Sequence, residues 1–312
     1  MKITFSLDTK SFIPDTKKSL VEYYELLKKN IIVFTATFLV LFSILASIAR
    51  LTSNSSILPK FIFFVLIISL LLIFIPALID YLTKKKFLLS NSIISACIFF
   101  LIVDPTQNVI ITIIACILLL LVRFFFRYKN VPFLNPVVTS LSLLSLFFTY
   151  FTLKNFSDSV FISWWGTSFW QLIDNYRLTV AGLLIIGFGA FITWKLNRWR
   201  IVLFTLLFLL ICWLFHFAFL VNIRDFKENI SQLFELLLGG TLAFGIFFME
   251  VEPKSSPGKK ADQIFYALFF SLVFTTMYFY NLENSLLYSL FATTIFFAAV
   301  KYIPILYSQK SK

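Results

Sequence analysis

Residues Gly239–Pro257 read GGTLAFGIFFMEVEPKSSP and carry the strongest structural signal in the chain. Small residues at 239–241 and 245 let helices pack closely against one another in lipid. The apolar run that follows ends in two carboxylates and two prolines, a combination that stops a helix and orders the turn after it. The stretch therefore predicts a membrane helix with a close-packed beginning and a sharply defined end.

The same pattern occurs earlier in the chain. Phe99-Phe100 is followed after three residues by Asp104-Pro105, just as Phe247-Phe248 is followed by Glu252-Pro253. Each element is displaced by 148 positions, close to half the length of the chain. A constant displacement of this size is typical of an internal duplication.

Composition places the chain in a membrane. Of its 312 residues, 60% are hydrophobic and only 13% are charged, and the apolar residues form runs of the length that crosses a bilayer. The net charge of +12 comes from short basic clusters between these runs, so we expect the lipid bilayer rather than nucleic acid as its partner. The three cysteines lie inside apolar runs without metal-ligand spacing, and no metal site is predicted.

About ten spans are predicted, with a charge pattern that orients them. They cover residues 31–49, 61–82, 87–103, 107–126, 132–152, 177–194, 201–221, 231–250, 262–281 and 284–306. If the N-terminus is cytoplasmic, 21 of the 27 Lys and Arg residues fall on the cytoplasmic side and 6 on the outer side. Omitting one span would break this alternation, so we expect a multi-pass protein of the cell (inner) membrane with both termini cytoplasmic.

The duplication and the span count together predict inversion. Asp104 follows the third span and faces outward, whereas Glu252 follows the eighth and faces inward. Because these spans are five apart, a repeated five-span unit must be inverted in the membrane, and such repeats commonly enclose a site near the midplane. The predicted fold is all-α and polytopic, with repeats at 31–152 and 177–312 joined by an outer aromatic loop at 153–176.

Residues 1–30 precede the first span and carry a basic, amphipathic pattern. Leu20, Tyr23, Tyr24 and Leu27 would share one face of a short helix lying on the anionic cytoplasmic leaflet. The alternative is a disordered basic tail.

Three segments could take part in a site. Asn135-Pro136 begins the fifth span, where Asn135 either re-satisfies a freed carbonyl or coordinates a ligand, or simply marks the helix start. The outer-loop segment Trp164–Trp170, which includes Trp165 and Thr167, is either an aromatic belt at the headgroups or a stacking platform for a planar cofactor. The turn Ser255–Lys260 offers hydroxyls and amides suited to a phosphate, although most such turns bind nothing. Asp174 and Arg177 could pair at the end of the outer loop.

Acidic residues near the predicted spans suggest an ion pathway. Glu235 lies about one turn inside the eighth span, where it is either an ion or proton ligand or a solvated acid at the helix start. With Asp104 and Glu252 it completes the candidate set. His216, alone in the seventh span, is expected to be a hydrogen-bonded packing residue rather than a ligand.

These motifs together resemble one family, the membrane protein shared by the Rnf ferredoxin:NAD oxidoreductase and the sodium-pumping NADH:quinone oxidoreductase. The stretch 239–257 resembles its eighth-span signature, a Gly-rich turn leading to Phe-Met, Asp-Pro and Ser-Pro. Arg127-Tyr128 with Phe133–Pro136 is similar to its Arg-Tyr and Phe-Asn-Pro segment, and Trp164–Gly166 matches a motif of shorter members. The order of motifs agrees from about residue 85 to 305.

The resemblance implies two inverted five-span repeats, like those of urea and ammonium transporters. It also implies a flavin-bearing redox role, beside other membrane subunits of a complex that couples electron transfer to sodium or proton movement. The Asn135-Pro136 and Ser256-Pro257 segments would belong to the central site. No catalytic residue is assigned. The candidate cofactor-binding residues are Asn135, Pro136, Trp165, Thr167, Thr241, Ser256 and Pro257.

The chain departs from this family at the covalent flavin site. Members with a covalent flavin carry Ser/Thr-Gly-Ala-Thr in an outer loop, and Gly166-Thr167-Ser168 does not match it. We therefore expect a non-covalent flavin (FMN or riboflavin) and no covalent FMN. The missing tetrapeptide also motivates a rival hypothesis, a channel or transporter for a small solute or ion with the same inverted-repeat pore.

Overall fold

The computed structural model describes residues 30–84, 89–128, 131–132, 134–151, 162–173, 178–220, 226–252 and 256–310. The predicted interfacial helix in residues 1–30 and the predicted pair of Asp174 with Arg177 lie outside these ranges, apart from Asn30.

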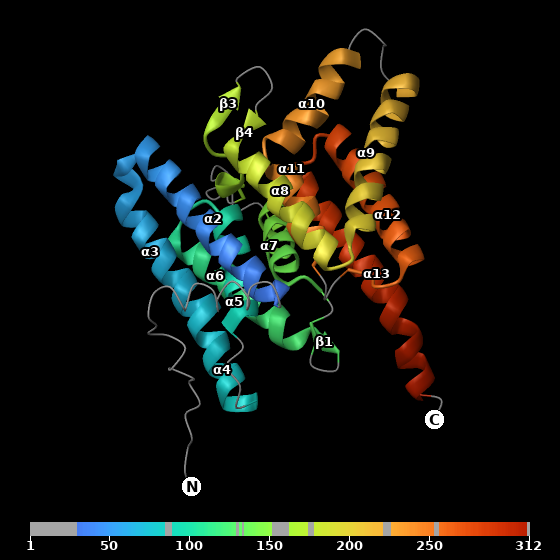
Figure 1. The fold of residues 1–312 in the computed structure, drawn as a ribbon. Coiled ribbons are helices and arrows are strands. Elements are labelled where there is room, and N and C mark those ends of the chain that lie inside the picture. The colour runs from blue at the N-terminus through green and yellow to red at the C-terminus, as the bar shows by residue number, and fades with distance from the viewer. Residues whose placement is uncertain are drawn as a thin grey trace.

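The N-terminal half consists of helices joined by short turns (Figure 1). Its helices are α2 (Ile31–Ser53), α3 (Leu58–Ile68), α4 (Ile75–Lys84), α5 (Leu89–Ile102), α6 (Val109–Phe125) and α7 (Pro136–Phe151). A 3₁₀ turn, η2 (Ser55–Ile57), precedes α3, and a π-helical segment, η3 (Ser69–Phe74), joins α3 to α4 without a break. The short antiparallel strands β1 (Arg127–Tyr128) and β2 (Val131–Pro132) connect α6 to α7.

The C-terminal half begins after an irregular segment. That segment holds the 3₁₀ turn η4 (Trp165–Thr167) and the antiparallel strands β3 (Gln171–Ile173) and β4 (Leu178–Thr179). The helices that follow are α8 (Val180–Lys195), α9 (Trp199–Leu220), α10 (Phe226–Leu238), α11 (Thr241–Phe244), the π-helix η7 (Gly245–Glu250), α12 (Lys260–Phe279) and α13 (Ser285–Lys310). Within the described residues, each of the ten predicted spans therefore contains helix, although the predicted ranges also include short strands or turns at several ends and the break at 239–240.

Several helices are long and apolar enough to cross a membrane. Four in the described part of the chain meet this condition: Ile31–Ser53, Ser55–Ile79, Trp199–His216 and Lys260–Phe279. A fifth is obtained if the bent pair Ser231–Leu238 and Thr241–Glu250 is one span. The other helices at predicted spans are apolar but shorter, with 10–17 residues in their described apolar segments.

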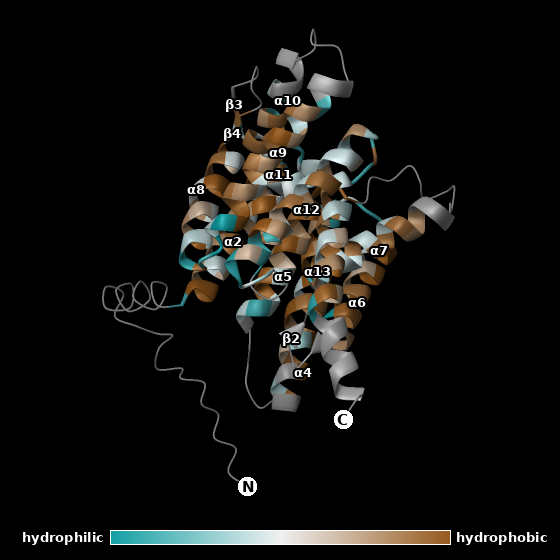
Figure 2. Cartoon of the chain, turned by 90° about the vertical axis from the view of Figure 1, so that its right-hand side faces the viewer, coloured by the Kyte–Doolittle hydropathy of each residue, from teal (hydrophilic) through white to brown (hydrophobic). Residues whose placement is uncertain are grey.

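The surface of the helices is apolar. Leu41, Leu66 and Leu203 are each more than half exposed, and many other large apolar side chains point outward in the same way. Figure 2 shows these helices mostly in brown, the colour of hydrophobic residues. Such extended apolar surface is unfavourable in water and favourable in lipid, which agrees with the composition.

Short polar side chains begin many of these helices. The side-chain oxygen of Asn30 accepts hydrogen bonds from the first turn of α2, and Asn108 does the same for α6 at 2.9 Å from Ile110 N. Thr179 Oγ1 accepts from Gly182 N at 2.9 Å and so caps α8. These caps satisfy backbone amides that have no partner within the helix.

The predicted eighth span is two helices rather than one. α10 and the α11–η7 segment are bent by 61° at Gly239-Gly240. Gly240 has φ of +101°, a left-handed conformation that side chains disfavour, and a Cβ there would lie 2.0 Å from the carbonyl oxygen of Thr167. The glycine pair therefore breaks the helix where the η4 turn packs against it.

The two halves pack in a corresponding way. α2 contacts α5 in the N-terminal half, and α8 contacts α10, α11 and η7 in the C-terminal half. α6 packs on α3 and α7, while α12 packs on α9 and α13. Between the halves, α2 contacts α8 and α7 contacts α13. The beginning of α2 and the end of α13 point toward the same end of the molecule in Figure 1.

Candidate functional site

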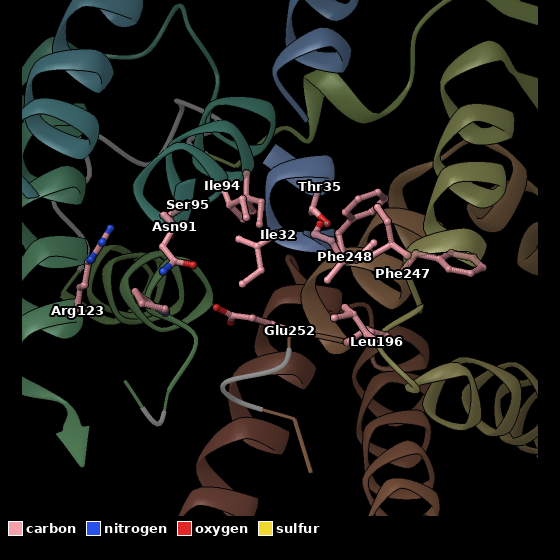
Figure 3. A pocket seen from close by; sticks show the side chains of 15 residues that line it. Ile32, Thr35, Asn91, Ile94, Ser95, Arg123, Leu196, Phe247, Phe248 and Glu252 are labelled. Carbon is pink, nitrogen blue, oxygen red and sulfur yellow. Dashed lines mark hydrogen bonds between the residues drawn. The ribbon is translucent and has the colours of Figure 1, made fainter. Parts of the chain in front are cut away.

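A cavity of about 230 Å³, here called cavity A, lies between the two halves (Figure 3). α2, α5, α6 and α7 form its wall on the N-terminal side, and α8 and η7 form its wall on the C-terminal side. Residues of the sequence signature take part, because Phe247, Phe248 and Glu252 all line it.

Cavity A combines apolar walls with a few polar groups. Isoleucines and the two phenylalanines supply most of its surface, while Asn91, Arg123 and Glu252 supply charge and hydrogen-bonding groups. In Figure 3, Glu252 projects from one side toward Asn91 and Arg123 on the other. Arg123 is buried and donates from Nη2 to Ser92 Oγ at 3.0 Å, which fixes the guanidinium beside the cavity. Such an arrangement suits a ligand with an apolar ring and a polar edge.

The two phenylalanines are placed by η7 and by close packing on α8. A Cβ on Gly189 would lie 2.6 Å from Phe247 Cβ, so only glycine allows this approach. Phe248 stacks on Phe38 with ring centroids 5.5 Å apart and on Phe244 at 5.3 Å. π-helical segments frequently occur at functional sites, where the wider turn redirects side chains.

A second cavity, cavity B, of about 720 Å³ is formed by β3, β4, α10, α11 and the end of α12. Its wall is more polar than that of cavity A and includes Ser168, Gln232, Glu235, Thr241 and Tyr278. Ser231 Oγ donates to Glu235 Oε1 at 3.3 Å on the same helix. Cavity B therefore presents a carboxylate and hydroxyls at the outer strands.

A series of aromatic rings connects cavity A to cavity B. Phe248 of cavity A stacks on Phe38, whose ring lies 5.6 Å from that of Phe42. Phe42 lies 5.2 Å from Phe169, which lines cavity B. These contacts form a continuous series of rings from a residue that lines cavity A to one that lines cavity B.

The Asn135-Pro136 segment is divided between two roles. Asn135 is buried, and its side-chain oxygen accepts from Val137 N and Val138 N at 3.1 Å each, so it caps α7. Pro136 is the first residue of that helix and lines cavity A. The structure thus gives Asn135 the helix-start role and brings Pro136 to the cavity.

The Ser256-Pro257 turn is bonded within the protein. Ser256 is buried, with its Oγ 3.4 Å from the carbonyl oxygen of Val251. The carbonyl of Pro257 accepts from Arg198 Nη1 and from Gln263 Nε2. Burial lowers the pKa of the Arg198 guanidinium from its ordinary value. The turn joins the α8–α9 connection to the start of α12, and neither residue lines cavity A or cavity B.

The outer-loop residues lie inside the protein. Trp165 is buried, donates from Nε1 to the carbonyl of Phe100 at 2.8 Å, and packs edge-on against Phe61 and Phe100. Thr167 and Thr241 are brought together, with their hydroxyl oxygens 3.1 Å apart, and Thr241 lines cavity B.

The three predicted ion-pathway residues are separated. Glu252 lines cavity A and Glu235 lines cavity B, whereas Asp104 lines neither. Asp104 Oδ1 accepts from Thr106 N at 2.8 Å and from Thr106 Oγ1 at 2.6 Å, which orders the turn after α5. The ring of His216 stacks on Phe279 at 3.5 Å.

Three functional candidates are not predicted from the sequence as site residues. The sequence pattern indicates Arg123 only as an orienting charge, and it does not single out Asn91. Glu250 is interpreted there as part of a helix stop, yet it is fully buried. The sequence does contain a signal for Glu250, because a carboxylate within an apolar run is costly in a membrane and by default indicates a functional site.

Among the residues that the structure describes, no group of three or more His, Cys, Asp or Glu residues is placed to hold a metal ion. No protein-family model matches the chain, and no curated protein matches its sequence.

Proposed function

We propose that the chain is a membrane protein of the cell membrane with ten spans in two inverted five-helix halves. We further propose that it is a flavin-associated subunit of an ion-translocating electron-transport complex of the Rnf or sodium-pumping quinone oxidoreductase type, with other membrane subunits as partners.

The packing pattern supports the inverted repeat. The five segments of the N-terminal half are α2, α3–α4, α5, α6 and α7, and those of the C-terminal half are α8, α9, α10–η7, α12 and α13. If they correspond in this order, the contacts of α2 with α5, α3 with α6 and α6 with α7 recur as those of α8 with α10–η7, α9 with α12 and α12 with α13. The contacts between halves, α2 with α8 and α7 with α13, join first to first and last to last segments. This is the arrangement expected around a pseudo-two-fold axis. In Figure 1, α5 runs away from the end of the molecule at which α2 begins, whereas the matching segment α10–η7 runs toward that end. The two segments therefore run in opposite directions.

The distribution of basic residues supports the orientation. α4, the β1–β2 hairpin and the end of α13 lie at one end in Figure 1. Lys84 ends α4, Arg127 begins β1 and Lys195 ends α8. An end rich in Lys and Arg is the one typically retained in the cytoplasm, which supports a cytoplasmic side for the opening residues of α2 and for cavity A.

Cavity A is the observation that carries the cofactor proposal. It is formed by both halves, and it gathers Pro136 and Glu252, two residues of motifs that the resemblance implicates, beside the ring of Phe248. A planar heteroaromatic ring can stack on phenylalanine while its polar edge meets Asn91 and Arg123. The volume of about 230 Å³ suits one ring system rather than a whole dinucleotide.

Flavin binding tests this proposal directly. The protein is purified in detergent, incubated with FMN or riboflavin, and flavin fluorescence is titrated. We expect the wild type to bind, and Phe248→Leu to weaken binding by about two- to tenfold, since aromatic stacking contributes about 0.5–1.5 kcal/mol. Phe215→Leu, on the exposed face of α9, is the matched control and should bind like the wild type. A wild type that neither retains nor gains flavin would refute the cofactor proposal.

The second candidate, a passage for a small solute or ion, is favoured by cavity B. Two cavities linked by a series of aromatic contacts resemble a gated path, with Glu235 at one end and Glu252 at the other. In proteoliposomes, Phe38→Ala should increase the flux by interrupting this series of rings, and Glu235→Gln should lower it. Liposomes that stay impermeable with both the wild type and Phe38→Ala would exclude this function.

A further inference from the structure

Glu250 is a fully buried carboxylic acid outside both cavities. It ends η7 and faces α9, where Thr205 Oγ1 donates to Glu250 Oε1 at 2.7 Å. Its second oxygen, Oε2, is buried and has no hydrogen-bond partner. Among the described residues no basic side chain forms an ion pair with it, and Thr205 is its one hydrogen-bonding partner.

Other buried oxygen atoms without partners lie on α12, which packs against α9, the helix that carries Thr205. The hydroxyl of Tyr266 in α12 is fully buried and has no hydrogen-bond partner, and the same holds for Gln263 Oε1 one turn earlier. Gln263 Nε2 is directed the other way, toward the carbonyls of Pro257 and Gly258. Ser271 Oγ donates to the carbonyl of Thr205 at 3.2 Å, which fixes α12 against α9 at this level.

An ionised carboxylate cannot be stable in this setting without a further partner. Removing a carboxylate from water costs several kcal/mol, and one hydroxyl donor does not offset that cost. The carboxyl must therefore hold a proton or a small cation. Its neighbours supply only oxygen atoms, which favour a proton or an alkali cation over a transition metal.

Glu252 and Tyr266 are the candidate groups for proton transfer between cavity A and Glu250. Glu252 follows Glu250 by two residues and lines cavity A. The Tyr266 phenol, on α12, interacts electrostatically with both carboxyls. The Tyr266 hydroxyl is not hydrogen-bonded to either carboxyl in this structure, so a proton that passes from Glu252 to Glu250 by this route needs a movement of the hydroxyl.

We propose that Glu250, Thr205 and Tyr266 form a binding site for a monovalent cation, occupied by a proton on Glu250 and loaded from cavity A. The site lies within the C-terminal half and does not depend on whether cavity A binds a flavin. Its failure is therefore distinguishable from failure of the cofactor proposal.

Infrared difference spectroscopy on the full-length protein in lipid tests this site. Spectra are recorded in sodium-free buffer at neutral pH. Subtracting the spectrum of Glu250→Gln from that of the wild type should reveal the carbonyl stretch of a protonated carboxylic acid. Glu283→Gln, an exposed carboxylate in the α12–α13 turn, is the matched control and should leave that band in place. Thr205→Val, which should fold normally, should move the band to higher frequency because the acid loses its hydroxyl donor.

A sodium arm identifies the occupant. Adding sodium chloride at constant pH, with potassium chloride as the control, should leave the acid band unchanged if the occupant is only a proton. Loss of the band with a gain of carboxylate bands would support the same site with sodium as a competing occupant. An ionised Glu250 in sodium-free buffer, or a band that Thr205→Val does not move, would overturn the proposal.

Discussion

Replacing Gly240 by alanine should destabilise the protein strongly, because this glycine forms the bend in the eighth span. Its φ of +101° is unfavourable for any residue with a Cβ, at about 1–2 kcal/mol. The added methyl would also lie 2.0 Å from the carbonyl oxygen of Thr167, well inside contact distance. Overpacking of this kind costs about 1–3 kcal/mol.

The contact at Gly240 cannot be relieved cheaply by moving the outer loop. Thr167 is buried and its amide donates to Trp164 O at 3.0 Å, while Trp165 is bonded to the carbonyl of Phe100. Displacing Thr167 would disturb these bonds. The strain and the steric cost together therefore predict a loss of about 2–5 kcal/mol in the free energy of unfolding.

Gly187→Ala is the matched control. A Cβ on Gly187 would meet no atom within 4 Å, and alanine is favoured over glycine within a helix such as α8 by about 0.5–1 kcal/mol. Reversible unfolding in mixed micelles by titration with sodium dodecyl sulfate, followed by the fluorescence of the six tryptophans, measures both variants. If Gly240→Ala unfolds at the same detergent fraction as Gly187→Ala, the bend and its packing on Thr167 are wrong.

Three further predictions concern single side chains. Asn135→Ala should lower the free energy of unfolding by about 1 kcal/mol through loss of the α7 cap, with flavin affinity unchanged, and an equally stable variant would contradict the capping role. A double-mutant cycle of Thr167→Val and Thr241→Val, measured by the same unfolding titration, should give a coupling of about 0.5–1.5 kcal/mol for their hydrogen bond, and strict additivity would contradict it. Arg123→Gln should weaken FMN and riboflavin alike by about tenfold or more in fluorescence titrations, since a hydrogen bond to a charged group contributes about 1.5–3 kcal/mol, and a loss confined to FMN would contradict the contact of Arg123 with the ring.

Helix positions follow closely from the sequence because apolar runs and polar caps are local signals. Asn30 and Asn108 mark the beginnings of α2 and α6 within two residues of the predicted spans. The bend at Gly240 depends on a distant partner instead. The sequence indicates Gly239-Gly240 as a surface for helix packing, and only the position of Thr167 shows that the pair also breaks the helix.

The candidate site is predictable where motif and position coincide. Pro136 begins one helix and Glu252 follows the end of another, and both of these helix ends border cavity A between the halves. Arg123 could not be assigned in this way, because at the end of an apolar run an arginine that orients a helix and one that lines a cavity have the same sequence context. In the structure, the hydrogen bond from Arg123 to Ser92, on the neighbouring helix α5, holds the guanidinium beside cavity A.

The two carboxylates at the end of η7 illustrate why a stop signal and a site are hard to tell apart. Glu250 is the last residue of η7, and Glu252 lies two residues beyond that end, outside the helix. Glu252 lines cavity A, while Glu250 is directed toward α9, where it accepts from Thr205. One helical end thus carries an acid open to the space between the halves and a second acid closed off behind it.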